Sequence, residues 1–154
     1  MRMLSLLLLL LFGMALAQQA VLGEADSLLY EGNKIIYTGH VKFVRGDGVL
    51  TADKVIIYLD EKKKAKWAEA EGNVRYHDSK RKARANRATY DFQKEILTLT
   101  GNARVEEGPN FVEADEIIYY KKEDRAVAVS KGQRVRTFYV EEKGEQGKPN
   151  KKGE

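Results

Sequence analysis

Four side chains that could do acid–base chemistry recur in one local phrase, each directly after an alanine. They are Asp26, Asp53, Asn86 and Asp115, spaced 27, 33 and 29 residues apart. Paired carboxylates can act as general acid and base or bind a hard cation. One member is an amide, and a catalytic pair would not be spread through repeats. We therefore expect each side chain to cap a neighbouring turn by accepting hydrogen bonds from backbone N–H groups.

The remaining reactive side chains are few and isolated. The chain has no cysteine, and its two histidines, His40 and His77, lack a second histidine at metal-ligand spacing. No nucleophile lies beside a base, and Gly46-Asp47-Gly48 is a turn rather than a phosphate-binding loop. The sequence predicts no catalytic residue, no metal ligand and no cofactor, so we do not expect an enzyme.

An internal repeat contains these residues. A mid-segment glycine precedes the repeated alanine by 13 residues at Gly39, Gly72 and Gly101. Repeats of about 30 residues indicate a stacked architecture with one supersecondary unit per repeat. A degenerate copy begins at Gly132. The alternation breaks just before it, at Val127, and this predicts a bulge or frayed pairing near the end of the series.

Hydrophobic residues alternate with polar ones between regularly spaced turn signals, and no useful length has helical periodicity. The predicted turns are Glu31–Asn33, Gly46–Gly48, Asp60–Lys63, Asp78–Lys80, Phe92–Glu95, Glu106–Asn110 and Lys122–Asp124. A glycine in the middle of a strand predicts a bend or a bulge. Trp67 is on the polar side of its strand, where it either covers an edge or marks a bulge. The predicted fold class is all-β, an antiparallel sandwich, barrel or roll.

One side of these strands is apolar and forms the candidate lipid-binding inner face. Its members are Leu28, Tyr30, Ile35, Tyr37, Val41, Phe43, Val55, Ile57, Val74, Tyr76, Tyr90, Leu97, Leu99, Val105, Ile117 and Tyr119. Such a surface could hold acyl chains. The alternative is that these side chains only pack against one another as a core.

The net charge of +4 is mildly basic and below the footprint of a typical nucleic-acid binder. Lysine and arginine gather in two predicted turns. One interpretation is that these side chains are only solvated, and the other is that they contact the phosphates of a lipid headgroup. They are Lys62, Lys64, Lys66, Lys80, Arg81 and Lys82.

The two ends of the chain differ from its middle. Residues 1–17 combine a basic start, a short apolar run and Ala15-Leu16-Ala17, as in a cleavable secretory signal peptide. The run is shorter than the roughly 20 residues of a membrane span. We expect export to the periplasm, a β domain over residues 18–140, and a disordered charged tail over residues 141–154.

The phrases Gly72-Asn73-Val74 and Ala114-Asp115, behind such a leader, resemble those of the LptA/OstA family over residues 20–140. The resemblance implies a single V-shaped, open-ended β-jelly roll with an apolar inside. It also implies carriage of lipopolysaccharide from the inner to the outer membrane, with lipid A acyl chains along that inside. The expected partners are further copies of the chain, an LptC-like inner-membrane protein and an LptD-like outer-membrane protein, joined by edge-strand pairing. Unpaired edges recruit strands on physical grounds as well.

Other functions remain open at this point. An LptC-like protein has the same fold but keeps its membrane anchor. A scaffold module of the envelope could bind another glycolipid. A polyanion binder would use the lysine-rich turns, and its binding would weaken steeply with salt.

Overall fold

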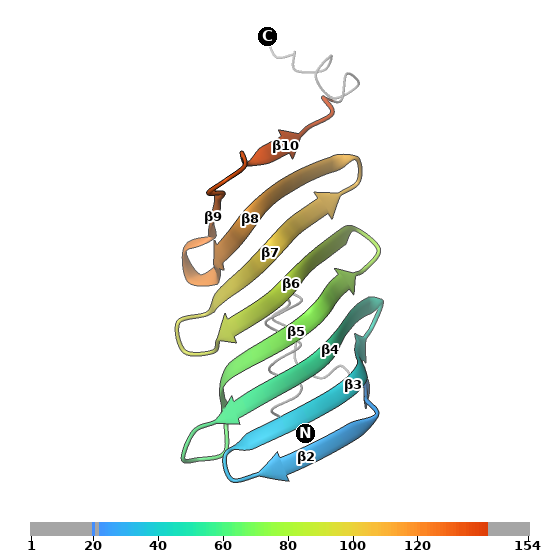
Figure 1. Ribbon diagram of the computed structural model, residues 1–154, viewed down its shortest axis with the longest axis vertical. Helices are drawn as coiled ribbons and strands as arrows, with labels where there is room; N and C mark the ends of the chain where they lie inside the picture. The colour runs from blue at the N-terminus through green and yellow to red at the C-terminus, as the bar shows by residue number, and fades with distance from the viewer. Residues whose placement is uncertain (1–19, 21, 142–154) are drawn as a thin grey trace.

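The computed structural model describes residue 20 and residues 22–141, which form one open antiparallel sheet (Figure 1). The leader expected over residues 1–17 lies outside the described residues. So does the expected tail beyond residue 141. The predicted all-β class is confirmed, because the described chain consists of strands, turns and a single short 3-10 helix.

The strands are long and follow one another in space as they do in sequence. They are β1 (Leu22–Glu24), β2 (Ser27–Glu31), β3 (Lys34–Arg45), β4 (Gly48–Leu59), β5 (Ala65–His77), β6 (Arg81–Asp91), β7 (Ile96–Glu107), β8 (Asn110–Tyr120), β9 (Arg125–Val129) and β10 (Arg136–Phe138), with the 3-10 helix η1 at Lys121–Glu123. The order is β1-β3-β4-β5-β6-β7-β8-β10. In addition, β2 pairs with β3, and β9 pairs with β8.

Turn chemistry explains where the strands end. The carboxylates of Asp60, Asp78 and Asp91 each accept hydrogen bonds from backbone N–H groups two to four residues ahead, which folds the chain back at once. Asp124 adopts the left-handed conformation after η1 and directs the chain into β9. Every turn predicted from the sequence separates two strands of the sheet.

Each long hairpin bends at the repeated glycine. Gly39, Gly72 and Gly101 have φ of +84°, +82° and +87°, and the residue after each has φ of +48° or +49°. The pairing register shifts at these points, so that two residues on one strand oppose one on its neighbour. These are β-bulges, as the sequence predicts, and they divide every long strand into two arms.

The bulges correct one expectation about alternation. Strict alternation along β4 would put Asp53 on the inner side with Val55 and Ile57, and this expectation is wrong. Asp53 is exposed, and the inner face changes parity across it, from Ala52 on one side to Val55 on the other. The pairs Val41–Ala52 and Tyr37–Val55 keep both arms facing inward.

The repeated Asp or Asn packs against the next strand rather than capping a turn. A Cβ at Gly39, Gly72 or Gly101 would lie 2.8 to 2.9 Å from the Cβ of Asp26, Asp53 or Asn86, respectively. Glycine is required because neither this contact nor the positive φ accommodates a side chain. The expected capping is met only at the fourth copy, where Asp115 accepts a hydrogen bond of 2.9 Å from the N–H of Lys131.

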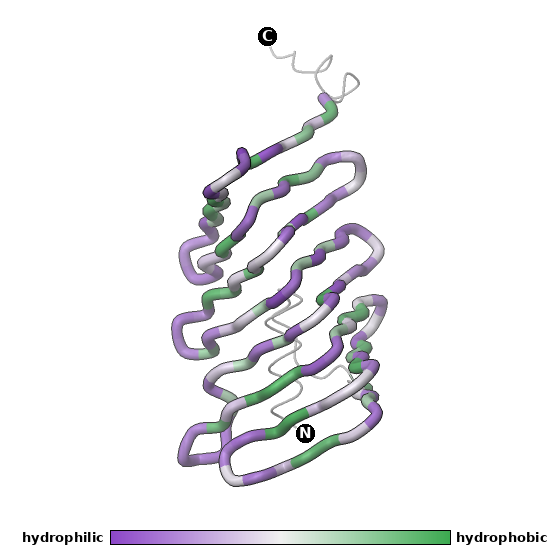
Figure 2. The backbone as a smooth tube through the Cα atoms, in the orientation of Figure 1, coloured by the Kyte–Doolittle hydropathy of each residue, from purple (hydrophilic) through white to green (hydrophobic). Residues whose placement is uncertain are grey.

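The core lies along the inner face and is densest at the N-terminal end of the sheet. Figure 2 shows the longest hydrophobic stretches in β2, β3 and β4, and polar turns along the left-hand side. Phe43 and Ile57 are fully buried, and Val41 and Leu59 nearly so. Trp67 lies on the opposite, outer face, where its indole N–H donates to Glu69 at 3.0 Å and the register shifts just beyond it.

The candidate lipid-binding face and the sheet edges

The sheet brings all the predicted inner-face residues to one side. Successive strands place them directly opposite one another, so that the backbone register alone builds apolar rows across the sheet. One such row is Tyr30, Ile35, Ile57, Ala68, Tyr90, Leu97 and Tyr119. A second row, in the other arm, is Phe43, Leu50, Tyr76, Ala83, Val105 and Val112.

The rows are not equally covered. Side chains in the middle of the sheet are buried: Ile35, Tyr37, Val41, Phe43, Val55, Ile57, Val74, Tyr90, Leu99 and Ile117. Tyr76, Leu97, Val105 and Tyr119 are half-buried. Leu28 and Tyr30 are 59% and 54% exposed, because they lie on β2 at the end of the sheet. The predicted face is thus a continuous apolar surface whose N-terminal end is open to solvent.

The predicted lipid-binding set left out several further inner residues. They are mostly alanines next to the bends, together with two leucines of β4: Leu50, Ala52, Leu59, Ala85, Ala103 and Ala114. Small side chains at a bend let the two arms approach each other. The invariant alanine of the repeat was the available signal, since a buried position that faces a bend favours a small residue.

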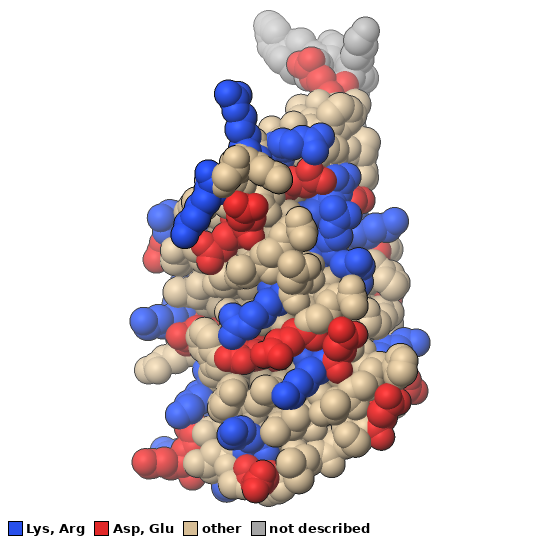
Figure 3. Space-filling view, viewed as in Figure 1, with Lys and Arg blue, Asp and Glu red and all other residues tan. Residues whose placement is uncertain are grey.

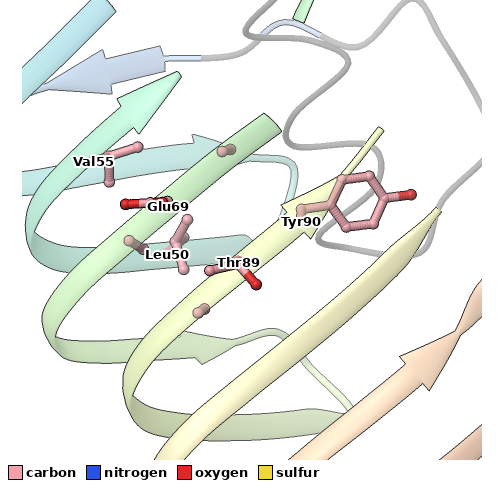
Figure 4. A pocket seen from close by; sticks show the side chains of 8 residues that line it. Leu50, Val55, Glu69, Thr89 and Tyr90 are labelled. Carbon is pink, nitrogen blue, oxygen red and sulfur yellow. The ribbon is translucent and has the colours of Figure 1, made fainter. Parts of the chain in front are cut away.

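A small cavity lies between the arms in the middle of this face. It has a volume of about 20 Å³ and is lined by residues of β4, β5 and β6, among them Leu50, Val55 and Tyr90 (Figure 4). That volume suits one water-sized group rather than an acyl chain. Leu50 and Val55 belong to different arms of β4, so the cavity spans the bend.

The tyrosines of this face stay neutral. Burial raises the pKa of the Tyr37 and Tyr90 hydroxyls above the ordinary value. Burial also raises the pKa of Tyr76, and its hydrogen bond of 2.5 Å to Asp78 adds to this effect. The inner face therefore gains no negative charge near neutral pH from these hydroxyls.

Both ends of the sheet present edges with large exposed apolar side chains. At the N-terminal edge Leu22, Leu28, Leu29 and Tyr30 are exposed. At the C-terminal edge Val129 is exposed, and so is a run after it: Val135, Phe138, Tyr139 and Val140. Within the described residues, β1 and β2 pair only with β3, while β9 and β10 pair only with β8. Such edges are templates for pairing with another strand.

The structure does not bring the predicted headgroup cations together. Lys62, Lys64 and Lys66 lie at or beside the β4–β5 turn, whereas Lys80, Arg81 and Lys82 lie at the far end of β5. The 13 residues of β5, which bend at Gly72, separate the two groups by at most roughly 40 Å. The two groups therefore lie at opposite ends of one strand. All six side chains are exposed, and only Lys82 joins a larger basic cluster.

The described residues also bear on metal binding and on membrane insertion. Among them, no group of three or more His, Cys, Asp or Glu side chains is arranged to hold a metal ion. Over the same residues, no helix has the length and apolar character needed to cross a membrane.

Known proteins share this sequence pattern and this sheet. Lipopolysaccharide export system protein LptA of Escherichia coli (strain K12) is 28% identical over 125 residues, which cover 76% of this chain and 68% of that protein. The protein of the same name from Haemophilus influenzae is 28% identical over 137 residues, covering 83% of this chain and 80% of that protein.

A solved structure has the same fold. LptH, the LptA homologous periplasmic component of the lipopolysaccharide transport device of Pseudomonas aeruginosa, superposes with a TM-score of 0.66 at 19% identity, covering 80% of this chain and 97% of that one. The family described as LptA/(LptD N-terminal domain) LPS transport protein matches residues 15–125, well over half of the chain. The chain therefore belongs to the LptA/(LptD N-terminal domain) family of LPS transport proteins.

Proposed function

We propose that this chain is a periplasmic bridge protein that carries lipopolysaccharide from the inner to the outer membrane. The observation that carries the proposal is the continuous apolar inner face, in a chain whose relatives are named lipopolysaccharide export proteins. Burial of acyl chains is driven by the apolar area removed from water, about 25 cal/mol per Å². A lipid that binds to this face must displace the side-chain contacts that bury the inner-face residues in the lipid-free protein.

In this proposal the acyl chains lie along the rows that contain Val74, Tyr90 and Leu99, and the saccharide headgroup stays in water. The exposed end of the face at Leu28 and Tyr30 is the entry or exit for lipid. The six candidate headgroup cations lie at the two ends of β5, so a headgroup would contact one group of three. The groups are Lys62, Lys64 and Lys66 at one end, and Lys80, Arg81 and Lys82 at the other. The rest of the transport route is reached through partners.

The partners in this proposal are strands that pair with the two edges. A second copy, an LptC-like inner-membrane protein or an LptD-like outer-membrane protein would add a strand to β1 and β2 or to β9 and β10. The apolar side chains at both edges support this arrangement, because pairing would remove them from water. Joined sheets would continue the inner face from one copy to the next.

Loading of purified protein with lipopolysaccharide tests the proposal. We expect binding that changes little between low and high salt and that Val74→Asp abolishes. An unpaired charge on the buried inner face costs several kcal/mol. Thr100→Asp adds the same charge at an exposed outer position and should bind normally. Binding that disappears at high salt while the Val74 variant still loads would favour a polyanion binder instead.

A further inference from the structure

The outer face of one arm carries a row of arginines in register. Arg75 of β5 pairs with Arg84 of β6, and Arg84 pairs with Arg104 of β7. Neighbouring strands are about 4.8 Å apart, so three guanidinium groups project from adjacent positions. Like charges directly opposite one another destabilise a sheet. A row of three needs a compensating partner or a function.

The other arm of the same strands shows how this chain neutralises charge. There Glu71 pairs directly with Arg87, and Arg87 also contacts Glu69 at 3.1 Å. The arginine row has no such alternation along its strands. The excess of positive charge is therefore specific to the arm that carries the arginine row.

The carboxylates near the row serve only one end of it. Arg104 is held by Glu106 at 2.6 Å and by Glu113, and it stacks over the ring of Phe111 at 3.9 Å. These contacts raise the pKa of Arg104, most of all the hydrogen bond that it donates to Glu106. The hydrogen bond that it donates to Glu113 lowers the pKa of that carboxyl. Arg104 is thus fixed in place and permanently charged.

The other two arginines of the row, and Lys82 beside them, have weaker carboxylate contacts than Arg104 or none. Arg84 reaches Glu113 only at 3.8 Å, and its side chain is 44% exposed. Arg75 donates to the carbonyl oxygen of the adjacent Val74 at 3.4 Å, and within the described chain it has no carboxylate within ion-pair distance. Lys82 likewise has no carboxylate within ion-pair distance among the described residues, although it lies opposite Glu106 as well as His77 in the sheet. Three cations therefore face water beside one that is locked.

These side chains surround a groove of about 490 Å³, lined by Arg75, Tyr76, His77, Lys82, Ala83, Arg84, Arg104 and Glu106. Figure 3 shows basic side chains gathered at the right-hand side of the upper half, where the β5–β6 and β7–β8 hairpins end in Figure 1. A groove of this size holds a small molecule larger than a single ion. Its charged side chains project from the outer face of the sheet, while Tyr76 and Ala83, which belong to the inner-face row, complete the lining.

We propose that this groove, the arginine groove, binds a phosphate monoester carried on a saccharide. Guanidinium forks match phosphate oxygens in a bidentate arrangement, and Arg75, Arg84 and Lys82 would supply the donors. The carboxylate oxygen of Glu106 that does not hold Arg104 would accept a hydrogen bond from a sugar hydroxyl, since Glu106 lines the groove beside these donors. Phosphate binding at this groove does not depend on the proposed function. Only the identity of the natural ligand does, because we take it to be the phosphorylated headgroup of the transported glycolipid.

Titration of the full chain without lipid tests this site separately from the inner face. The probes are glucose 6-phosphate, inorganic phosphate and vesicles of phosphatidylglycerol, followed by backbone amide shifts of β5, β6 and β7. We expect saturable binding of glucose 6-phosphate that is tighter than that of inorganic phosphate. Arg75→Gln with Arg84→Gln should weaken it about tenfold or more, because two charge-assisted hydrogen-bond donors are lost. Lys34→Gln with Lys94→Gln removes the same charge from exposed positions outside both candidate binding sets and should change it less than about twofold.

Each other result would overturn the inference. No saturable binding at about 10 mM glucose 6-phosphate would remove the site. Equal weakening by the lysine control would show general charge attraction, and equal affinity for inorganic phosphate would exclude the saccharide. If the protein bound phosphatidylglycerol vesicles but not glucose 6-phosphate, the groove would be a membrane-binding surface instead. If the double variant fails to fold, Arg75→Gln alone gives the same comparison. Lipid loading measured in parallel keeps this outcome distinct from failure of the transport proposal.

Discussion

The carboxylate of Asp26 lies 2.8 Å from Nδ1 of His40, across the first bend of the sheet. In the second bend Asp53 accepts a longer hydrogen bond, 3.3 Å, from Asn73, which occupies the place of His40. Because an imidazole titrates near neutral pH, the cross-strand contact at the first bend responds to pH in that range.

The hydrogen bond to Asp26 and the charge of that carboxylate raise the pKa of His40. A raised pKa in the folded state stabilises the fold below the unfolded value of about 6.5, and this contribution is lost as the pH rises through the folded value. We expect His40→Asn to reduce the fall in unfolding free energy between about pH 6 and pH 8. Urea unfolding over that range measures it, with His77→Asn as the matched control. An unchanged pH profile in His40→Asn would contradict the assignment.

Substitution at a bend should cost much more than substitution at a turn. Gly72 has φ of +82°, and an added Cβ would lie 2.8 Å from the Cβ of Asp53. We expect Gly72→Ala to lower the unfolding free energy by about 2–4 kcal/mol. Gly32 has φ of +60° with nothing within 4 Å of an added Cβ, so Gly32→Ala should cost about 1 kcal/mol. Chemical denaturation compares the two.

A double variant separates the contact from the backbone strain at the same bend. Asp53→Ala in the Gly72→Ala background removes most of the side chain that the added methyl group meets. Part of the lost stability should return, leaving the cost of the positive φ and of the contact with the Cβ that alanine keeps at position 53. If Gly72→Ala were as mild as Gly32→Ala, the close approach at the bend would not hold the arms in place.

Proline in the C-terminal edge strand should block elongation. Thr137 is the middle residue of the three-residue strand β10, which pairs only with β8 among the described residues. Whichever way its N–H points, Thr137→Pro either unpairs β10 or removes a donor from the free edge. We expect the parent chain to grow in mass with concentration in light scattering and this variant to stay monomeric. Gln133→Pro, outside the strand, should elongate like the parent.

The turns, the alternation and the glycine bulges could all be predicted from the sequence, because each depends on neighbours a few residues away. The change of parity at Asp53 could not, because it depends on how many residues each of two strands contributes to a bulge. For the same reason Leu50 and Ala52 were missed as inner residues. The pattern alone did not indicate that Asp26 packs on Gly39 of another strand.

The arginine groove shows the same limit at the level of a site. Arg75 and Arg104 each follow the repeated glycine by three residues, but nothing in the pattern places Arg84 between them. The three become neighbours only through the register of two hairpins. Conversely, the two lysine-rich turns predicted as headgroup contacts are close in sequence but lie at opposite ends of β5.

The central claim is that lipid travels on the inner face, and photocrosslinking from two adjacent positions of β7 tests it most directly. Leu99 is buried on the inner face, and Thr100 is exposed on the outer face. With a photoreactive residue at each position in turn, in cells, Leu99 should yield a lipopolysaccharide adduct and Thr100 should not. An adduct at Thr100 with none at Leu99, or equal adducts at both, would contradict the account.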